Sequence, residues 1–329
     1  MAINDVADNQ IATVRKRRPQ WQDFFIRLVK EKPMGTFGGV IVLLLLVVGL
    51  SASWLAPHGY NAIDLYNRLK PPSTGHILGT DQLGRDELSR IIYGARVSLI
   101  IGLGASAIST AIAAVIAITS GYLGGNFDIL VQRVVDAWLS FPSLILLLSA
   151  MALLGPGVWQ VTLVLGIATG IGGSRIIRSG VITIKSNIYI EGARSIGAST
   201  FQVLYNHILR NMIPFLVIYF TVMMAGMILA EAGLSFLGFG IPPPYPSWGG
   251  MLSLEGRTYM LQSPWLALWP GLSLSLVVYG VNMFGDAVRD LLDPRLRGGV
   301  GTYIGIGEKG KKLKISRKIQ HRKEGKREE

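Results

Sequence analysis

The sequence predicts an all-α, polytopic membrane protein with six transmembrane helices, preceded by an amphipathic helix and followed by a basic tail. Half of the 329 residues are hydrophobic, only 16% are charged, and glycine occurs 40 times. A soluble domain of this length is rarely so apolar, whereas a surface that faces lipid must be. The positive charge is concentrated near the two ends of the chain, so long uncharged stretches remain between them.

Residues 1–35 form a predicted N-terminal region that contains the amphipathic helix. Between Gln20 and Lys32, apolar side chains recur with spacings of three and four residues, at Trp21, Phe24, Phe25, Leu28 and Val29. That spacing places them in one stripe of a helix, and Arg27 and Lys30 lie off it. A short helix of this kind is expected to lie on the membrane surface.

Residues 36–297 form the predicted transmembrane domain. Crossing the hydrocarbon takes about 20 apolar residues, and six segments meet that need: Thr36–Ala56, Arg96–Tyr122, Ile129–Leu154, Val158–Ser174, Ile213–Phe239 and Trp265–Ala287. In the fourth segment, Gly166 and Gly170 are four residues apart. Small residues at that spacing predict close approach of a neighbouring helix.

The distribution of basic residues predicts that both termini are cytoplasmic. With the N-terminus inside, the inner segments carry 25 of the 32 Lys and Arg residues. Basic residues gather in cytoplasmic loops, so this orientation is favoured. It places the polar stretch 57–95 outside and the basic stretch 175–212 inside. A third stretch, Ile241–Pro264, contains Pro242, Pro243, Pro244 and Pro246 near its start, cannot be a continuous helix, and is expected to cap the outer mouth.

The sequence offers little support for a metal or nucleotide site. There is no cysteine, and the four histidines are far apart without zinc-like spacing, so no metal site is predicted. Gly305–Gly310 fits G-x-G-x-x-G, but no strand precedes it, and Lys312 stands where Ser or Thr would hold Mg²⁺. The basic residues 298–329 are expected to form a solvated tail near anionic lipid rather than a nucleic-acid contact.

Few charges fall inside the predicted spans. Arg133 and Asp136 are one helical turn apart and are expected to pair. Glu231 is open to two interpretations: it lines a pathway, or it is a structural carboxylate near Ser247 or Trp248. The structural role is favoured. Asp286, near the end of the last span, is a further pathway or structural candidate.

The inner stretch at about 185–212 carries the most informative pattern. Small or apolar residues recur there at Ile190, Ala193, Gly197, Phe201, Leu204 and Ile208, which predicts one helical face. Two glycines within it, Gly192 and Gly197, disfavour helix by about 1 kcal/mol each relative to alanine. Glycines at such a cost suggest the close approach of another backbone.

This stretch resembles the E-A-A-x-x-x-G loop of ABC importer permeases. Glu191, Ala193, Gly197 and Ile208 match it, and the resemblance implies an ATPase-coupling set of Glu191, Gly192, Ala193, Arg194, Gly197, Ala198 and Ile208. In that family the loop forms a cytoplasmic coupling helix that docks on an ATP-binding subunit. Gly192 replaces the usual alanine, and Arg210 stands where the peptide group usually has proline, which affects where the helix ends.

Three further blocks are similar to the second, C-type permease of the dipeptide/oligopeptide/nickel group. The outer-loop block His76–Arg96 includes Gly79, Thr80, Asp81, Gly84, Arg85 and Asp86. The others are Glu231–Gly240 with Pro246–Gly250, and Gly285–Leu296. The likeness runs from about Trp21 to Arg297.

The resemblance implies a type I ABC importer fold in a prokaryotic plasma (inner) membrane. The chain would be a permease subunit rather than an enzyme, with no cofactor of its own, because ATP and Mg²⁺ bind to the ATPases. Expected partners are a homologous permease, two ATPase subunits, an extracytoplasmic substrate-binding protein and the lipid bilayer. Peptides are the expected cargo; nickel chelates or another small solute remain alternatives. A passive channel would need rings of polar residues, which the spans lack.

Overall fold

The computed structural model describes residues 20–292 of the chain. Within this range every extended regular element is a helix, and the one β-type pairing is an isolated antiparallel bridge between Thr80 and Asp86. The predicted all-α class is therefore confirmed. The Gly305–Gly310 stretch and the tail 298–329 lie outside the described residues.

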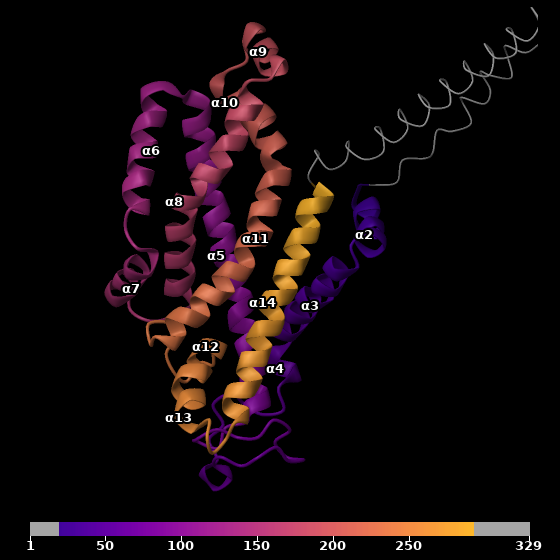
Figure 1. Ribbon diagram of the computed structural model, residues 1–329, viewed down its shortest axis with the longest axis vertical. Helices are drawn as coiled ribbons and strands as arrows, with labels where there is room; N and C mark the ends of the chain where they lie inside the picture. Colours follow the sequence, from indigo (N-terminus) through magenta and orange to yellow (C-terminus); the bar gives the residue numbers. More distant parts are fainter. Residues whose placement is uncertain (1–19, 293–329) are drawn as a thin grey trace, which may run out of the picture.

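Five helices are long and apolar enough to cross a membrane, and a bent pair of shorter helices can supply a sixth span. The five are α3 (Pro33–Leu50), α5 (Glu87–Leu123), α8 (Val158–Lys185), α11 (Arg210–Phe236) and α14 (Trp265–Leu292). Most of them run along the long axis of the molecule, and α3 crosses it obliquely (Figure 1). With the bent pair counted once, the structure agrees with the six predicted spans.

The bent pair corrects one predicted segment. Ile129–Leu154 is divided into α6 (Gly125–Leu139) and α7 (Ser143–Leu154), and the two helices are bent by 85°. Pro142 at the break has no backbone N–H, and its ring disfavours helical geometry at the residue before it. The hydropathy pattern missed the bend because a proline in an apolar run is simply one more uncharged residue.

Two other spans are longer than predicted. Helix α5 begins at Glu87 rather than Arg96, because the Asp86 carboxylate caps it by accepting a hydrogen bond from the Ser89 backbone N–H at 2.8 Å. Helix α8 continues beyond Ser174 to Lys185. The predicted segments stopped at charged residues, whereas a helix continues through charges once it leaves the apolar layer.

Close packing of α5 against α8 confirms the prediction for the glycine pair. A Cβ atom added at Gly170 would lie 2.9 Å from the Ser109 carbonyl oxygen, and one at Gly166 would lie 2.7 Å from Ile108 Cβ. Any side chain at these positions would push the two helices apart. The glycines therefore set the separation of α5 and α8.

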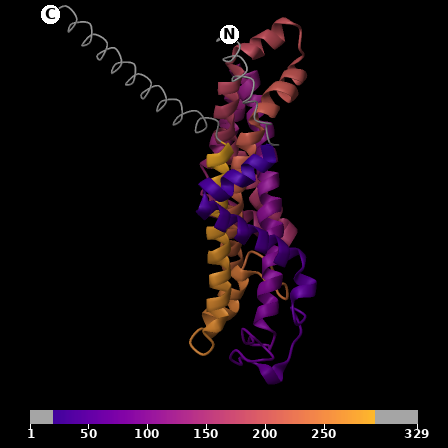
Figure 2. The ribbon, with the colours of Figure 1, turned by 90° about the vertical axis from the view of Figure 1, so that its right-hand side faces the viewer.

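The predicted amphipathic helix is present as α2 (Gln20–Glu31). Its Leu28 is buried against Ala287 and Leu291 of α14, while Phe25 and Val29 are 58% and 60% exposed. The apolar stripe is therefore divided between packing on the bundle and an outward face. Figure 2 shows α2 and α3, in indigo, lying across the bundle beside α14.

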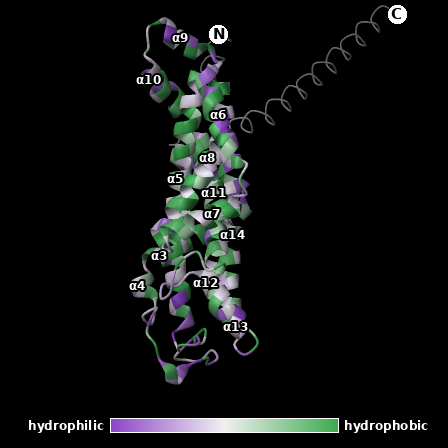
Figure 3. Cartoon of the chain, turned by 90° about the vertical axis from the view of Figure 1, so that its left-hand side faces the viewer, coloured by the Kyte–Doolittle hydropathy of each residue, from purple (hydrophilic) through white to green (hydrophobic). Residues whose placement is uncertain are grey.

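The bundle has two different ends. The first, named here the α9 end, carries α9 (Ile188–Ser195), α10 (Thr200–Gln202) and the π-helical η2 (Val203–Leu209). The second, named the loop end, carries residues 56–86, which follow α4 (Ala52–Leu55) and include the one-turn η1 (Leu65–Asn67). Hydrophilic segments gather at both ends and apolar ones along the bundle between them (Figure 3).

The proline-rich stretch 241–264 also lies at the loop end. It is irregular through its prolines and then forms a short helical cap made of α12 (Trp248–Met251), η3 (Leu252–Gly256) and α13 (Arg257–Tyr259). The predicted absence of one continuous helix over this stretch is confirmed.

Candidate functional site

Helix α9 contains the residues that resemble a coupling loop, and it ends in a tight turn at Gly197. Gly197 has φ +85°, the Gly197 N–H donates to the Arg194 carbonyl at 2.9 Å, and the Ala198 N–H donates to the Ala193 carbonyl at 3.1 Å. This pair of bonds is a Schellman motif, which requires a left-handed residue at the position of Gly197. The glycine is explained by this backbone conformation, because no other atom lies within 4 Å of a Cβ placed there.

The turn corrects the prediction of one continuous helical face. After Gly197 the chain restarts with Ser199, whose side chain and that of Gln202 form a capping box. Phe201, predicted on the same helical face as Ile190 and Ile208, is 74% exposed, whereas those two are buried. A helical repeat of three and four residues cannot continue through a left-handed turn. The apolar residues are therefore regularly spaced in the sequence but do not share one helical face in the structure.

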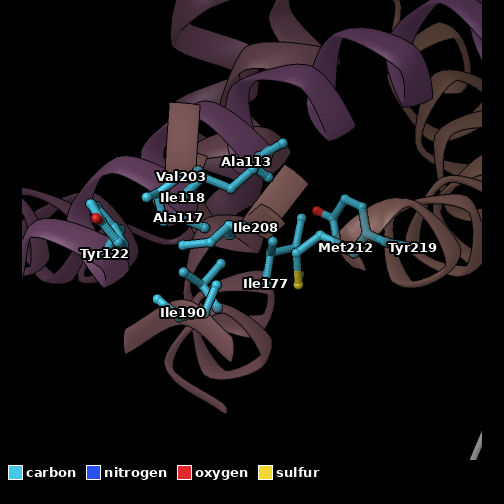
Figure 4. Close-up of a cluster of buried hydrophobic side chains, with 12 residues drawn as sticks. Ala113, Ala117, Ile118, Tyr122, Ile177, Ile190, Val203, Ile208, Met212 and Tyr219 are labelled. Atoms are coloured by element: carbon cyan, nitrogen blue, oxygen red, sulfur yellow. The ribbon is translucent and has the colours of Figure 1, made fainter. Parts of the chain in front are cut away.

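The buried side of α9 is held by a hydrophobic cluster. Ile190 of α9 and Ile208 of η2 are fully buried, and they pack with Ile118 of α5 and Ile177 of α8 (Figure 4). Ala193 is also buried, at 8% exposure. Burying each isoleucine side chain contributes about 1.5–3 kcal/mol. The cluster therefore fixes α9 to two long helices rather than leaving it on a free loop.

A second contact fixes the same helix to the end of α5. The Arg194 Nε donates a hydrogen bond to the Tyr122 hydroxyl at 3.2 Å, and its guanidinium carbon lies 4.8 Å from the centre of the Tyr122 ring. A cation over an aromatic face adds about 0.5–1 kcal/mol at a partly exposed site. Arg194 thus joins the candidate coupling helix directly to α5.

The other side of α9 is open. Glu191, Gly192 and Gly197 are exposed. Gly192 is helical, and nothing lies within 4 Å of a Cβ placed on it. Two large apolar side chains, Ile188 and Ile196, are 85% and 87% exposed. A rigid helix with apolar side chains left uncovered is typical of a protein–protein contact.

Arg210, which departs from the resemblance, is the first residue of α11. Helix η2 continues directly into α11 there, and Pro214 lies inside the first turns of α11. A proline at position 210 would remove a backbone donor, so the arginine keeps this junction helical.

The predicted signature of the first polar loop folds into a buried turn at the loop end. Gly79 and Gly84 have φ values of +87° and +74°, and Thr80 and Asp81 are fully buried. Asp81 Oδ1 accepts hydrogen bonds from the backbone N–H groups of Leu83 and Arg85. These residues therefore specify the shape of the loop.

Arg85 connects this turn to the cap. It pairs with Asp81 at 2.6 Å and with Glu255 of η3 at 2.7 Å. Arg90 of α5 pairs with Glu255 at 2.9 Å. Burial raises the pKa of the Glu255 carboxyl, while Arg90 and Arg85 lower it in part. Glu255 was missed in the sequence, because a single acidic residue in a polar stretch gives no signal of its partners 165 and 170 residues away.

Two histidines that have no zinc-like spacing in the sequence lie side by side in the structure. His58 and His76 have ring centres 5.0 Å apart, and the His76 Nδ1 lies 2.9 Å from Asp86 Oδ1. The loop 56–86 folds back on itself, and spacing along the sequence carries no information about such a return.

The charges within the bundle separate into two kinds. Glu231 is 1% exposed and accepts a hydrogen bond from the Ser235 hydroxyl at 2.7 Å, with Ser247 as a further polar group beside it. That is the surrounding expected of a structural carboxylate, at the junction of α11 with the cap. Asp286, in contrast, is exposed on α14.

The predicted pair of Arg133 and Asp136 is present at 3.8 Å. Asp136 has a closer partner in Arg175 of α8, at 3.1 Å. Arg178, one turn further along α8, pairs with Asp128 of α6. These two contacts join α6 to α8. They could not be predicted from the sequence, because the partners belong to different helices.

Comparison with known proteins identifies two family profiles. One, described as "Binding-protein-dependent transport system inner membrane component", matches residues 90–298. The other, described as "N-terminal TM domain of oligopeptide transport permease C", matches residues 19–72. Together they cover α2 through α14, apart from the interval 73–89 in the polar loop.

Curated relatives are similar over most of the chain. The probable D,D-dipeptide transport system permease protein DdpC of Escherichia coli (strain K12) is 37% identical over 286 residues, which is 85% of this chain and 96% of the relative. A putative peptide transport system permease protein of Brucella suis is 38% identical over 271 residues, 82% and 90% of the two chains. The glutathione transport system permease protein GsiD of Escherichia coli O6:K15:H31 is 37% identical over 282 residues, 85% and 92% of the two chains.

Proposed function

The chain belongs to the family of binding-protein-dependent transport system inner membrane components, and we propose that it is the C-type permease of an importer of short peptides, driven by ATPases docked on α9. As a permease subunit of an ABC importer it is not itself catalytic. The proposal concerns how it connects to its partners and what it carries.

The observation that carries the proposal is the two-sided character of α9. Ile190 and Ala193 bury one side in the cluster shared with α5 and α8, while Ile188 and Ile196 remain exposed on the other. A helix held in this way can transmit a push or a pull to the bundle without deforming. The exposed apolar side chains supply the contact for an ATP-binding subunit.

The orientation follows from the same assignment. An ATPase works in the cytoplasm, so the α9 end faces inward and the loop end faces outward. The excess of Lys and Arg in the terminal segments and in residues 175–210 supports this orientation. The substrate-binding protein would then meet the loop end, and a homologous permease would pair with this chain in the membrane, above two ATPase subunits.

The proposed cargo is a di- or oligopeptide. Three similar permeases belong to systems named for D,D-dipeptides, peptides and glutathione, all of them short amide-linked molecules. Uptake by the complete reconstituted importer distinguishes this cargo from the alternatives. Labelled di- and tripeptides should accumulate with ATP, and accumulation of a nickel chelate alone would contradict the proposal.

The docking proposal is tested by Ile196→Asp. Because Ile196 is 87% exposed, the charge does not disturb the fold of this chain, but it removes an apolar contact at the centre of the proposed interface. Truncation of a central interface residue costs 2 kcal/mol or more, so ATPase co-purification should fall by about thirtyfold or more.

The matched control is Leu261→Asp. Leu261 is 95% exposed between α13 and α14, at the opposite end of the bundle. The control should retain the ATPases. Equal retention of the ATPases by Ile196→Asp would refute docking on α9, and their loss from Leu261→Asp alone would reverse the proposed orientation.

A further inference from the structure

The described part of the chain contains one group of three side chains able to hold a metal ion: His58, His76 and Asp86. Their ligand atoms all lie within 4.8 Å of one another. The three residues come from the start of the polar loop, a position further along that loop, and the cap of α5. From this placement we propose that they bind a zinc ion that holds the polar loop closed.

The distances suit zinc after a small adjustment. Zinc binds imidazole nitrogen and carboxylate oxygen at about 2.0–2.2 Å, so tetrahedral ligand atoms stand about 3.3 Å apart. His76 Nδ1 lies 2.9 Å from Asp86 Oδ1, and His58 Nδ1 lies 3.8 Å from the other carboxylate oxygen, Oδ2. All three ligand atoms already lie within 4.8 Å of one another, and movement of the more exposed ring, that of His58, is the adjustment that the proposed zinc binding requires.

The surrounding hydrogen bonds prepare the site. Ser89 Oγ donates to Asp86 Oδ2 at 2.7 Å and accepts from the His58 backbone N–H at 3.0 Å. One hydroxyl therefore positions two of the three ligands. With Oδ2 occupied by Ser89, the Oδ1 atom of Asp86 is turned toward His76. Such outer partners typically change metal affinity by about 10–100-fold when removed.

Burial gives the site a closed side and an open side. Asp86 is 2% exposed, His76 17% and His58 42%. The exposed edge of His58 provides access and leaves a fourth position for water. The positive end of the α5 dipole lies close to Asp86 and opposes a cation, so an affinity on the order of micromolar is expected rather than a tighter one.

Zinc bound here would act as a staple. Between His58 and Asp86 the chain runs for 27 residues with only the single turn η1 as regular structure. Long irregular loops are usually held by some additional device or are functional. The ion would tie the two ends of this loop and its midpoint to one spot at the start of α5.

The binding experiment uses the purified importer complex in detergent, stripped with a chelator and titrated with Zn²⁺ against a chromophoric competitor. One site per chain with a dissociation constant on the order of micromolar is expected.

His58→Gln should weaken binding at least tenfold, and Ser89→Ala about tenfold. His207→Ala, at the α9 end beside Tyr189, is the matched control and should bind like wild type. Co²⁺ in place of Zn²⁺ should give visible absorption that His58→Gln loses.

Two outcomes overturn the site: no stoichiometric binding below millimolar Zn²⁺, or equal affinity in wild type and His58→Gln.

The staple is tested separately by limited proteolysis of residues 59–85. Zn²⁺ should slow cleavage in wild type at least fivefold and have no effect in His58→Gln; cleavage unaffected by bound Zn²⁺ refutes the staple. Finally, radioactive zinc should stay with the protein during ATP-driven turnover, and its accumulation inside sealed vesicles would show that the ion is cargo instead.

Discussion

Arg90 and Glu255 are 165 positions apart in sequence, yet Arg90 Nη2 lies 2.9 and 3.2 Å from the two carboxylate oxygens of Glu255. This contact joins the first turns of α5 to the cap. Because Glu255 also receives Arg85, and Asp81 lies within ion-pair distance of both arginines, two carboxylates together compensate two buried guanidinium groups.

Replacing Glu255 with alanine should therefore destabilise the loop end more than a surface change would. Asp81 alone would then face both buried arginines, and removing one partner from a buried ion pair costs about 3–5 kcal/mol. We expect a lower midpoint for thermal unfolding of the purified chain. In hydrogen exchange, the slowly exchanging amides of residues 241–260 should lose the most protection. Arg257→Ala, on the exposed α13, is the control, and an equal shift in both variants would show that the ion pairs do not stabilise this end.

The helix contact at Gly170 gives a second prediction. Gly170→Ala introduces a methyl group 2.9 Å from the Ser109 carbonyl oxygen and should cost about 1–3 kcal/mol through strain. Gly226→Ala, on α11 with nothing within 4 Å, should be neutral or stabilise by up to about 1 kcal/mol. Unfolding of both variants in the same detergent tests the difference, and a Gly170→Ala protein as stable as wild type would contradict the packing.

Opposite effects are expected for two glycines in the same segment. Gly192→Ala should stabilise α9 by about 1 kcal/mol because the position is helical and open. Gly197→Ala should destabilise the turn by about 1–2 kcal/mol, since φ is +85° there. Hydrogen exchange of the α9 amides should become slower in the first variant and faster in the second. The same direction of change in both would argue against the Schellman turn.

Glu231 separates a structural role from a transport role. Glu231→Gln keeps an oxygen that accepts the Ser235 hydroxyl, so we expect normal folding and peptide uptake within about twofold of wild type. Glu231→Ala removes the acceptor of the buried Ser235 hydroxyl proton, while the Ser235 oxygen still accepts from the Ile241 N–H, and it should lower stability by about 1–3 kcal/mol. A Glu231→Gln protein that is stable but does not transport would show that the charge acts on the cargo or the pathway.

The sequence was sufficient for the elements that depend on composition along the chain. Apolar runs located the spans of α3, α11 and α14, and Trp21 to Val29 marked the amphipathic helix α2. The close helix contact at Gly166 and Gly170 was also predicted correctly, because small residues allow close approach in any pair of packed helices.

The features that the sequence analysis did not predict depend on where the chain bends or folds back on itself. The 85° bend before α7 comes from Pro142, and the turn after α9 comes from the left-handed backbone of Gly197. Neither changes hydropathy. The meeting of His58 with His76 and of Arg90 with Glu255 depends on which loops fold back, and no periodicity of the sequence encodes that.

Helix α5 has a mechanical consequence that follows from its length. Its 37 residues correspond to about 55 Å at 1.5 Å per residue, well beyond the roughly 30 Å of hydrocarbon that a span must cross. Tyr122, one residue from its far end, contacts Arg194, while Asp86 caps its beginning. The helix is thus a single rod between the two aqueous sides. Rotation of this rod by about 5° about one end displaces the other end by about 5 Å. Because Arg194 joins α9 to the rod, we expect a movement of α9 to displace the loop end as well.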